Sequence, residues 1–159
     1  MEPVSKHGGA KVRFPPPLVY VATIVVAELL DRFVTSLSIP LALAPRAALA
    51  AAIFIAGVGL GAVAQTWFRR TGQSPVPWKP SSELLMRGIY ARTRNPMYVG
   101  MTLMQLGIGI ALGKAWIVIA APLALAIVHV IAVLPEEAYL EHKFGDSYAR
   151  YKATVRRYL

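Results

Sequence analysis

Four long apolar stretches, separated by shorter polar segments, constrain this chain more than any other feature. They cover residues 18–39, 47–68, 96–112 and 115–134. An α-helix rises 1.5 Å per residue, so about 20 apolar residues cross a hydrocarbon layer of about 30 Å. Only 16% of the residues are charged, where a soluble domain has about 25%. The sequence therefore predicts an all-α integral membrane protein with about four transmembrane helices.

The basic residues gather between these stretches and give the chain an orientation. Residues 1–17 hold three lysines and arginines, residues 69–95 hold six, and the stretch after residue 134 holds five. The two opposite loops hold only Arg46 and Lys114. Since cytoplasmic loops are enriched in lysine and arginine, both termini are expected on the cytoplasmic side. The net charge of +9 then matches anionic lipid headgroups, and nucleic-acid binding is not expected.

A single membrane domain is expected, in three parts. Residues 1–17 read as a cytoplasmic tail that includes Lys6, because no small-residue cleavage site follows them as in a signal peptide. Residues 18–68 form two N-terminal spans. Residues 69–159 hold a long polar segment, a tight helical hairpin and C-terminal helices. Within the polar segment a short helix is expected to start at Ser81 or Ser82 and to end at Gly88.

Glycine pairs spaced by four residues occur in the second and third apolar stretches. They are Gly57 with Gly61, and Gly109 with Gly113. Such surfaces let helix backbones approach closely in lipid. Either pair could pack within one chain or between two, so a homodimer is one expected arrangement.

Three charges interrupt the first apolar stretch: Glu28, Asp31 and Arg32. Glu28 and Arg32 are four residues apart and could pair on one helix face. Charges at membrane depth usually face a bundle interior or a polar cavity, so these residues could line a channel to a substrate. The alternative is that the helix tilts or ends early and the charged groups reach the headgroups.

Residues 94–100 lie where the basic segment meets the third apolar stretch. Asn95 is of the type that caps helix N-termini, and Pro96 suits the first helical position. The backbone N–H groups after Pro96 would then face a loop that carries Arg92 and Arg94, and such an arrangement can bind an anion. The alternative is that the motif is only the capped start of a span.

An acidic pair, Glu136 and Glu137, follows the fourth stretch, where cations are the usual flanking residues. Glu136 comes seven residues after His129, so both are expected on one helix face. The alternative is that Pro135 restarts the helix, that both glutamates favour its dipole, and that His129 is a packing residue. Further on, Gly145 is expected to break the helix.

The last expected helix carries Tyr148, Tyr151 and Val155 at the spacing of one helix face. Such a cytoplasmic, amphipathic helix would either pack onto the protein or lie among the headgroups. No metal site is expected, since the chain has no cysteine and its histidines, His7, His129 and His142, are not at ligand spacing. What remains is a cytoplasm-facing pocket with an anion site and a cation site, which would suit a zwitterionic ligand.

Two motifs and their order carry a family resemblance. Residues 88–100 read Gly-Ile-Tyr-Ala-Arg-Thr-Arg-Asn-Pro-Met-Tyr-Val-Gly, and the second motif begins Pro135-Glu136-Glu137 and continues through Leu140, Phe144-Gly145, Tyr148 and Tyr151. With the hairpin between them, they resemble the isoprenylcysteine carboxyl methyltransferase and phospholipid methyltransferase superfamily. The resemblance covers residues 71–159 and indicates a bacterial member, placed in the inner membrane.

The resemblance implies a membrane enzyme that uses S-adenosylmethionine (SAM) in a cytosolic pocket. It places eight residues at the cofactor: Tyr90, Arg94, Asn95, Pro96, Tyr98, Gly100, Glu136 and Glu137. Eukaryotic members carry Arg-His-Pro at residues 94–96, so the role of that histidine is not carried over to this chain. A cationic residue near the active site of the family falls close to Lys143. The candidate catalytic residues are Glu137, His129 and Lys143.

The predicted function is SAM-dependent methyl transfer to a membrane-embedded small molecule or lipid, with a carboxylate, thiol or amine acceptor. One alternative is a non-catalytic membrane interaction module of the same fold. Another is an NADPH-dependent reductase, because sterol reductases share a related C-terminal half. Titration with SAM and with NADPH separates the three.

Overall fold

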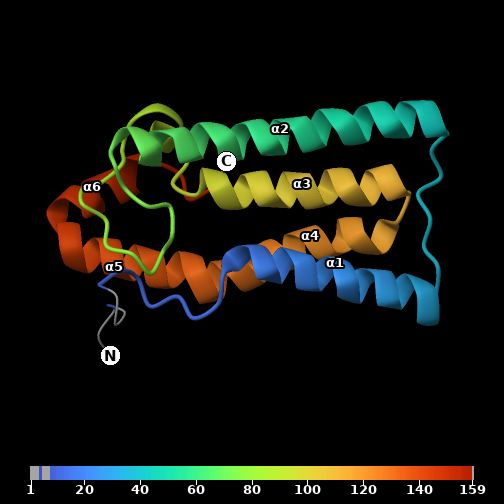
Figure 1. Cartoon of the computed structure of the whole chain (residues 1–159), viewed down its shortest axis with the longest axis horizontal. Coiled ribbons are helices and arrows are strands. Elements are labelled where there is room, and N and C mark those ends of the chain that lie inside the picture. Colours follow the sequence, from blue (N-terminus) through green and yellow to red (C-terminus); the bar gives the residue numbers. More distant parts are fainter. Residues whose placement is uncertain (1–3, 5–7, 159) are drawn as a thin grey trace.

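A computed structural model describes residue 4 and residues 8–158, so Lys6 and His7 lie outside the described part. Figure 1 shows four helices side by side, with the polar segments gathered at one end of the bundle. The elements in chain order are α1 (Pro16–Phe33), α2 (Leu43–Arg70), the short 3-10 helix η1 (Gly88–Ala91), α3 (Pro96–Leu112), α4 (Ala115–Val128), the π-helix η2 (His129–Val133), α5 (Leu134–Phe144) and α6 (Asp146–Thr154). The expected all-helical class is confirmed for the described residues.

The fourth apolar stretch and the acidic pair belong to one helix, because α4, η2 and α5 are continuous from Ala115 to Phe144. The alternative in which Pro135 restarts the helix is therefore wrong. A π turn precedes Pro135, and the N–H of Leu134 reaches back five residues to the carbonyl of His129. Proline lacks an N–H, and its ring would meet the carbonyl of Ile131 in an α-helix. The wider turn accommodates the proline without ending the helix.

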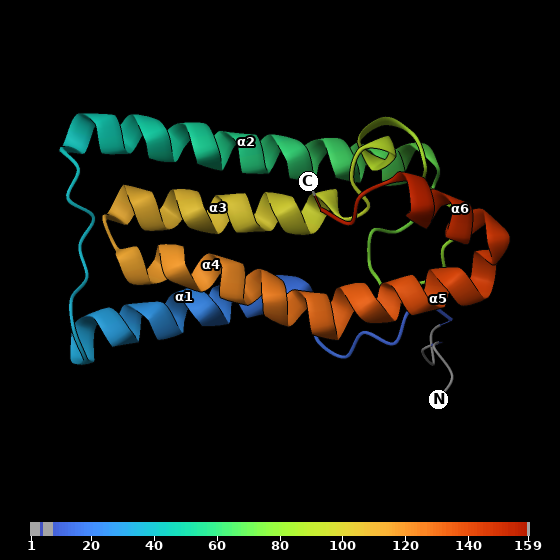
Figure 2. The same cartoon turned by 180° about the vertical axis from the view of Figure 1, so that it is seen from behind.

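The bundle is built on α2 and α3. A Cβ added to Gly57 would lie 2.6 Å from the carbonyl oxygen of Gly100, and one added to Gly100 would lie 2.8 Å from that of Gly57. The two backbones therefore touch, which is the close approach that small residues permit in lipid. Gly57 therefore packs against another helix of the same chain and not against a second copy. Behind this pair, α3 and α4 form the expected antiparallel hairpin, and α1 packs on α4 (Figure 2).

The outward faces of the helices are apolar. Leu18, Ile55 and Leu123 are each more than half exposed, and a contiguous apolar surface of this kind is not stable in water. Two helices are long and apolar enough to cross a membrane, α2 and the continuous helix Ala115–Phe144, while α3 is a shorter apolar helix. These features indicate a membrane location.

At the end of the bundle away from the polar segments, α1 ends at Phe33 and not near residue 39. Glu28 pairs with Lys114 of the α3–α4 turn, and Asp31 also lies 3.4 Å from Lys114. The expected pairing of Glu28 with Arg32 is wrong, since Arg32 instead lies over the ring of Phe33. These charges sit at the end of their helix, where they can reach the headgroup region, and not beside the other polar segments (Figure 1).

The polar segment between α2 and α3 is an irregular loop up to η1. The short helix expected near residues 81–86 is absent from it, and Gly88 begins η1 with a φ of 60°. The loop is organised by side-chain hydrogen bonds. Buried Gln73 accepts from the backbone N–H groups of Ser82 and Glu83, and the hydroxyl of Tyr139 accepts from the N–H of Ser81. This long segment is therefore anchored to the second half of the chain.

Candidate functional site

A cavity of about 300 Å³ lies at the polar end of the bundle. Most of its wall comes from four parts of the chain: the N-terminal segment with Pro15 to Pro17, the loop of residues 73–85, the start of α3 and the first turns of α5. Phe68 of α2, Tyr90 of η1 and Tyr151 of α6 complete it. Among the residues that the resemblance places at the cofactor, five line it: Tyr90, Asn95, Pro96, Tyr98 and Glu136. Most of the wall is apolar, with the polar groups at α3 and α5.

The N-terminal segment was expected only as a tail, but it covers this cavity. The N–H of Ala10 donates to the carbonyl of Pro77 at 2.8 Å. A Cβ on Gly9 would lie 2.3 Å from the backbone of Trp78, so the segment and the loop meet backbone to backbone. Trp78 is itself a residue of the cavity wall.

α3 begins at the predicted residue, but the side chain of Asn95 has a different hydrogen-bond partner from the predicted one. Pro96 occupies the first turn and Asn95 precedes it, yet the Asn95 side chain makes no cap hydrogen bond. Its amide nitrogen donates instead to the carbonyl of Arg157 at 3.0 Å. The N–H of Val99 makes the first helical bond, to the carbonyl of Asn95. The amides of Met97 and Tyr98 come before that bond and, like other first-turn amides, are available to a ligand at the cavity wall.

Glu136 faces α3 across the cavity. The hydroxyl of Tyr98 donates to a carboxylate oxygen of Glu136, and the carbonyl of Tyr98 accepts from the hydroxyl of Tyr20 at 3.1 Å. The carboxylate is thus held by a side chain from the helix that starts at Pro96. An N–H-rich helix start and a carboxylate therefore lie on the two sides of one cavity.

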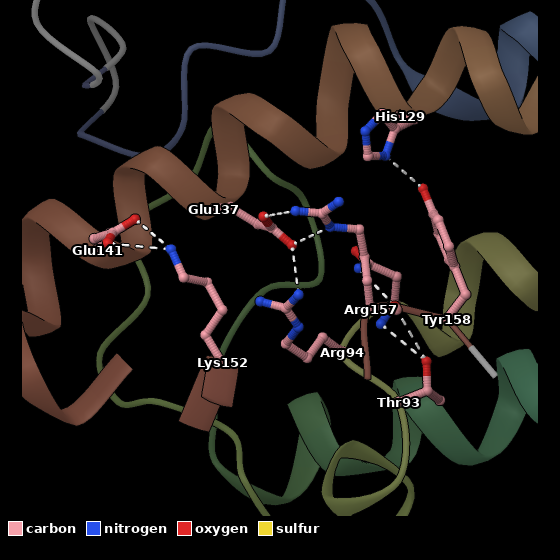
Figure 3. Close-up of polar contacts among 9 residues, drawn as sticks. Thr93, Arg94, His129, Glu137, Glu141, Lys152, Arg157 and Tyr158 are labelled. Atoms are coloured by element: carbon pink, nitrogen blue, oxygen red, sulfur yellow. Dashed lines mark hydrogen bonds and ion pairs between the residues drawn. The ribbon is translucent and has the colours of Figure 1, made fainter. Parts of the chain in front are cut away.

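Glu137, the neighbour of Glu136, points to a different place. Its two oxygens accept from Nε and Nη2 of Arg157 at 2.9 and 2.8 Å, and Nη2 of Arg94 lies 3.3 Å from the same carboxylate. Figure 3 shows both guanidinium groups converging on Glu137. The side chains of Arg94 and Glu137 are 8% and 11% exposed. The hydrogen bond to Glu137 raises the pKa of Arg157 further above its usual value.

Arg157 belongs to residues 155–158, called here the C-terminal strap, which returns from α6 to the start of α3. The N–H of Arg94 donates to the carbonyl of Arg156 at 3.0 Å, and Thr93 and Arg156 form a parallel backbone bridge. On the far side of the strap, the hydroxyl of Tyr158 lies 2.9 Å from Nδ1 of His129 (Figure 3). The strap therefore joins the first motif to the long helix.

The π turn explains why His129 and Glu136 do not act together. In a regular α-helix, residues seven apart lie on one face. The π turn holds one residue more than an α-helical turn, so after it the residue on the same face as His129 is eight positions along the chain. It is Glu137, eight residues on, that shares with His129 the contact with the strap. The prediction that His129 and Glu136 lie on one face is therefore wrong, and no local pattern in the sequence announces the extra residue.

Besides Arg94 and Glu137, which meet at the strap, three candidate residues lie away from the cavity wall. Gly100 packs against Gly57 and is a helix-contact residue. Lys143 is exposed, and its ammonium donates to the hydroxyl of Tyr139 at 3.3 Å. His129 is bound to Tyr158. Of the proposed catalytic residues, the structure brings Glu137 and His129 together at the strap and places Lys143 one turn beyond Tyr139, a residue of the cavity wall.

Tyrosines of α6 pack over the polar end of the bundle. Tyr148 is 1% exposed, and burial raises its pKa to about 12. The hydroxyl of Tyr151 donates to the carbonyl of Tyr90 at 2.6 Å, and burial raises the pKa values of both phenols. The expected tyrosine face of the last helix is thus packed onto protein, and these side chains stay neutral at physiological pH.

Sequence reasoning missed Arg157, Thr93 and Tyr158, the residues that connect the strap to the site. Arg157 was counted only as a topological charge. The available signal was weak: a basic pair followed by an aromatic residue directly after the tyrosine helix. Such a pair is common on cytoplasmic membrane flanks, so local sequence alone does not distinguish it.

Comparisons with known proteins agree with this geometry. A family model described as phospholipid methyltransferase matches residues 45–147. The chain is similar to an uncharacterised protein of Haemophilus influenzae, 36% identical over 63 residues, which is 40% of this chain and all of that protein. It is also similar to the protein-S-isoprenylcysteine O-methyltransferase of Schizosaccharomyces pombe, 39% identical over 72 residues, or 45% of this chain and 30% of the yeast enzyme. The match thus covers less than a third of that enzyme's length.

Proposed function

This chain belongs to the phospholipid methyltransferase family, and from that premise we propose that it transfers a methyl group from SAM to a membrane-embedded small molecule or lipid. The acceptor atom is a carboxylate oxygen, a thiol sulfur or an amine nitrogen. The observation that carries the proposal is the cavity between the start of α3 and Glu136, with one anion-binding and one cation-binding side.

The residues of the cavity fit SAM in size and charge. Ligand pockets begin at about 300 Å³, and this cavity has about that volume. The amino-acid part of SAM carries a carboxylate and an ammonium. First-turn N–H groups bind anions, so the amides of Met97 and Tyr98 would hold the carboxylate, with the positive charge of Arg94 nearby. Glu136 would hold the ammonium or the ribose hydroxyls, and Tyr98 orients Glu136.

When bound, SAM supplies an electrophilic methyl group on a sulfonium. The protein's part is to align the acceptor with that group and to exclude water, since well-oriented reactants gain most of the available rate enhancement from position alone. The apolar wall, which includes Phe68, Leu84 and Met101, removes water from the acceptor. A carboxylate or thiolate acceptor is already anionic and needs no base.

An amine acceptor would need a group to take its proton. The cavity wall includes two carboxylates, Glu83 of the loop and Glu136, and Glu136 is the one that Tyr98 holds against α3. His129 is engaged by Tyr158, and Glu137 by two arginines. We therefore assign the proton-accepting role, where the acceptor requires one, to Glu136. His129, Glu137 and Lys143 become supporting residues in this proposal.

The membrane arrangement is part of the proposal. All four bundle helices would cross the bilayer, with the cavity, the strap and both termini on the cytoplasmic side of a bacterial inner membrane. The distribution of arginine and lysine supports this orientation, because the polar end of the bundle carries most of them. The chain would act as a monomer or as a homodimer through an outer helix face.

Calorimetric titration of the purified protein in detergent with SAM or S-adenosylhomocysteine tests the proposal. Wild-type protein is expected to bind, and Glu136→Gln to bind roughly tenfold or more weakly, since one charge-assisted contact is lost. Glu141→Gln is the matched control, because Glu141 lies on the same helix in an exposed pair with Lys152. If the wild type bound NADPH and not SAM, the proposed methyltransferase function would be contradicted. Labelled SAM with a lipid extract then identifies the acceptor by mass spectrometry.

A further inference from the structure

We propose that Arg157 is a positioning residue of the cofactor site, and that the C-terminal strap fixes the gap between the start of α3 and Glu136. This inference rests on the proposed function. Arg157 does not line the cavity among the described residues, so it acts through the groups that it holds.

On one side the strap holds the residues just before α3. The Arg157 carbonyl accepts from the Asn95 side-chain amide at 3.0 Å and from the Thr93 hydroxyl at 3.4 Å. The Arg156 carbonyl accepts from the N–H of Arg94. Asn95 is itself a cavity-wall residue and directly precedes Pro96. Through it, the strap sets where the first-turn amides of α3 lie.

On the other side the strap holds the long helix just beside the cavity. The guanidinium of Arg157 makes two parallel hydrogen bonds to Glu137, the residue that follows cavity-wall Glu136. Such a fork fixes direction as well as distance. Tyr158 adds a second attachment at His129, within the π turn. Because Glu136 and Glu137 are adjacent on one helix, fixing Glu137 also fixes where Glu136 points.

The same contacts could belong to a latch that the cofactor displaces, but the burial of Glu137 and Arg94, which are 11% and 8% exposed beside the 38% exposed Arg157, argues for a permanent brace. Removing one partner of a buried ion pair costs on the order of 10²- to 10⁴-fold in an equilibrium constant. A ligand that had to break this cluster would lose that factor from its affinity. In the brace the cluster stays intact, and the cofactor uses only the cavity side of the two motifs.

Affinity measurements on strap variants test the brace. Arg157→Gln is expected to weaken S-adenosylhomocysteine binding by roughly 10- to 100-fold, because the two cavity walls lose their fixed spacing. Arg157→Lys is expected to recover part of that loss, since lysine keeps the charge but not the fork. Lys152→Gln is the control, because it breaks an exposed ion pair between the same two helices, α5 and α6, and is expected to bind as wild type.

A double-mutant cycle separates positioning from direct contact. If Arg157 acts through Glu137, then Arg157→Gln added to Glu137→Gln changes the affinity no further. The double variant and Glu137→Gln alone both leave Arg94 without its carboxylate, so the comparison between these two proteins isolates the effect of Arg157. Additive effects of the two substitutions would overturn the proposal, and so would an Arg157→Gln protein that binds as tightly as wild type or more tightly, as a latch predicts.

Hydrogen exchange on the ligand-free protein provides a readout that does not need the cofactor. Arg157→Gln is expected to speed amide exchange in residues 96–101, and Lys152→Gln to leave it unchanged. A wild type that binds no S-adenosylhomocysteine contradicts the proposed function, while the exchange result still decides whether the strap is a brace. Unchanged exchange in Arg157→Gln would refute the brace by itself.

Discussion

The two ends of the bundle hold ion clusters of opposite composition. At the polar end, where the cavity lies, one acid, Glu137, lies between Arg94 and Arg157. At the other end one base, Lys114, lies between Glu28 and Asp31. The shared acid of the first cluster is buried: Glu137 is 11% exposed, with Arg94 at 8% and Arg157 at 38%. The shared base of the second cluster, Lys114, is 27% exposed, with Glu28 at 45% and Asp31 at 10%. The same kind of charge pairing therefore has two uses.

The difference lies in what surrounds each cluster. Exposed ion pairs contribute little, because water and salt screen them, so the Lys114 cluster marks where the bundle meets the headgroups. Buried pairs cannot lose a partner without a large penalty, so the Glu137 cluster imposes one arrangement on the segments that meet there. The two clusters have the same number of ion pairs, so it is the burial of Glu137 that makes its cluster fix the local structure, while the more exposed Lys114 cluster does not.

The largest effect is expected from Glu137→Ala, which leaves two guanidinium groups without their shared carboxylate. We expect the free energy of unfolding to fall by about 3–5 kcal/mol. Equilibrium denaturation in detergent micelles measures it. A loss no greater than that of Glu141→Ala, on the exposed face of the same helix, would remove the distinction between the two ends.

Gly100→Ala is expected to come next, since its new Cβ would lie 2.8 Å from the backbone carbonyl of Gly57. Overpacking of this kind costs about 1–3 kcal/mol. Gly59→Ala is the matched control, because its Cβ would meet nothing within 4 Å, and alanine is the better helix former. Equal stability of the two variants by thermal denaturation would show that α2 and α3 do not depend on backbone contact.

The stability of the polar end of the bundle, which holds Tyr148, should also depend on alkaline pH. Burial raises the pKa of Tyr148 to about 12, above the value of about 10 in an unfolded chain. The folded protein then keeps a proton that the unfolded chain releases, so the stabilisation is complete below about pH 10 and is lost as the pH rises toward 12. Denaturation midpoints of the wild type should fall over this range, and those of Tyr148→Phe should fall less. Parallel curves would contradict the assignment.

The smallest effect is expected from Glu28→Gln. Its carboxylate pairs with Lys114 at a half-exposed site, where screening leaves little to lose. The denaturation midpoint should not change measurably, and affinity for S-adenosylhomocysteine should equal that of wild type. A loss of stability comparable to that of Glu137→Ala would show that the Lys114 cluster stabilises the bundle as much as the Glu137 cluster does, against the comparison above.

The sequence predicts those parts of this molecule that depend on near neighbours. The apolar stretches, the start of α3 at Pro96, the break at Gly145 and the close packing at Gly57 all follow from residue type and spacing. The role of Asn95 does not, because its side chain bonds to the strap, 62 residues further along the chain. Local capping preference is overruled there by a tertiary contact.

The functional site divides in the same way. The motifs correctly indicate that residues 94–98 and 136–137 meet, but not which of two adjacent glutamates faces the cavity. That choice depends on the π turn, which in turn depends on how Pro135 is accommodated within a packed helix. The loop of residues 73–85 was also unpredictable in detail, since Gln73 and Tyr139 organise it from a distance.

The π turn has a consequence for how this helix tolerates change over time. A π turn holds one residue more than an α-helical turn, so the loss of a single residue from η2 would restore a regular α-helix without changing the direction in which the following residues point. Glu136 would still face the cavity, and Glu137, then seven residues after His129, would still face Arg157. Elsewhere in this helix the loss of one residue would rotate both acids by about 100° away from their partners. The π turn is thus the place in the helix where a change in length leaves both the cavity and the strap intact.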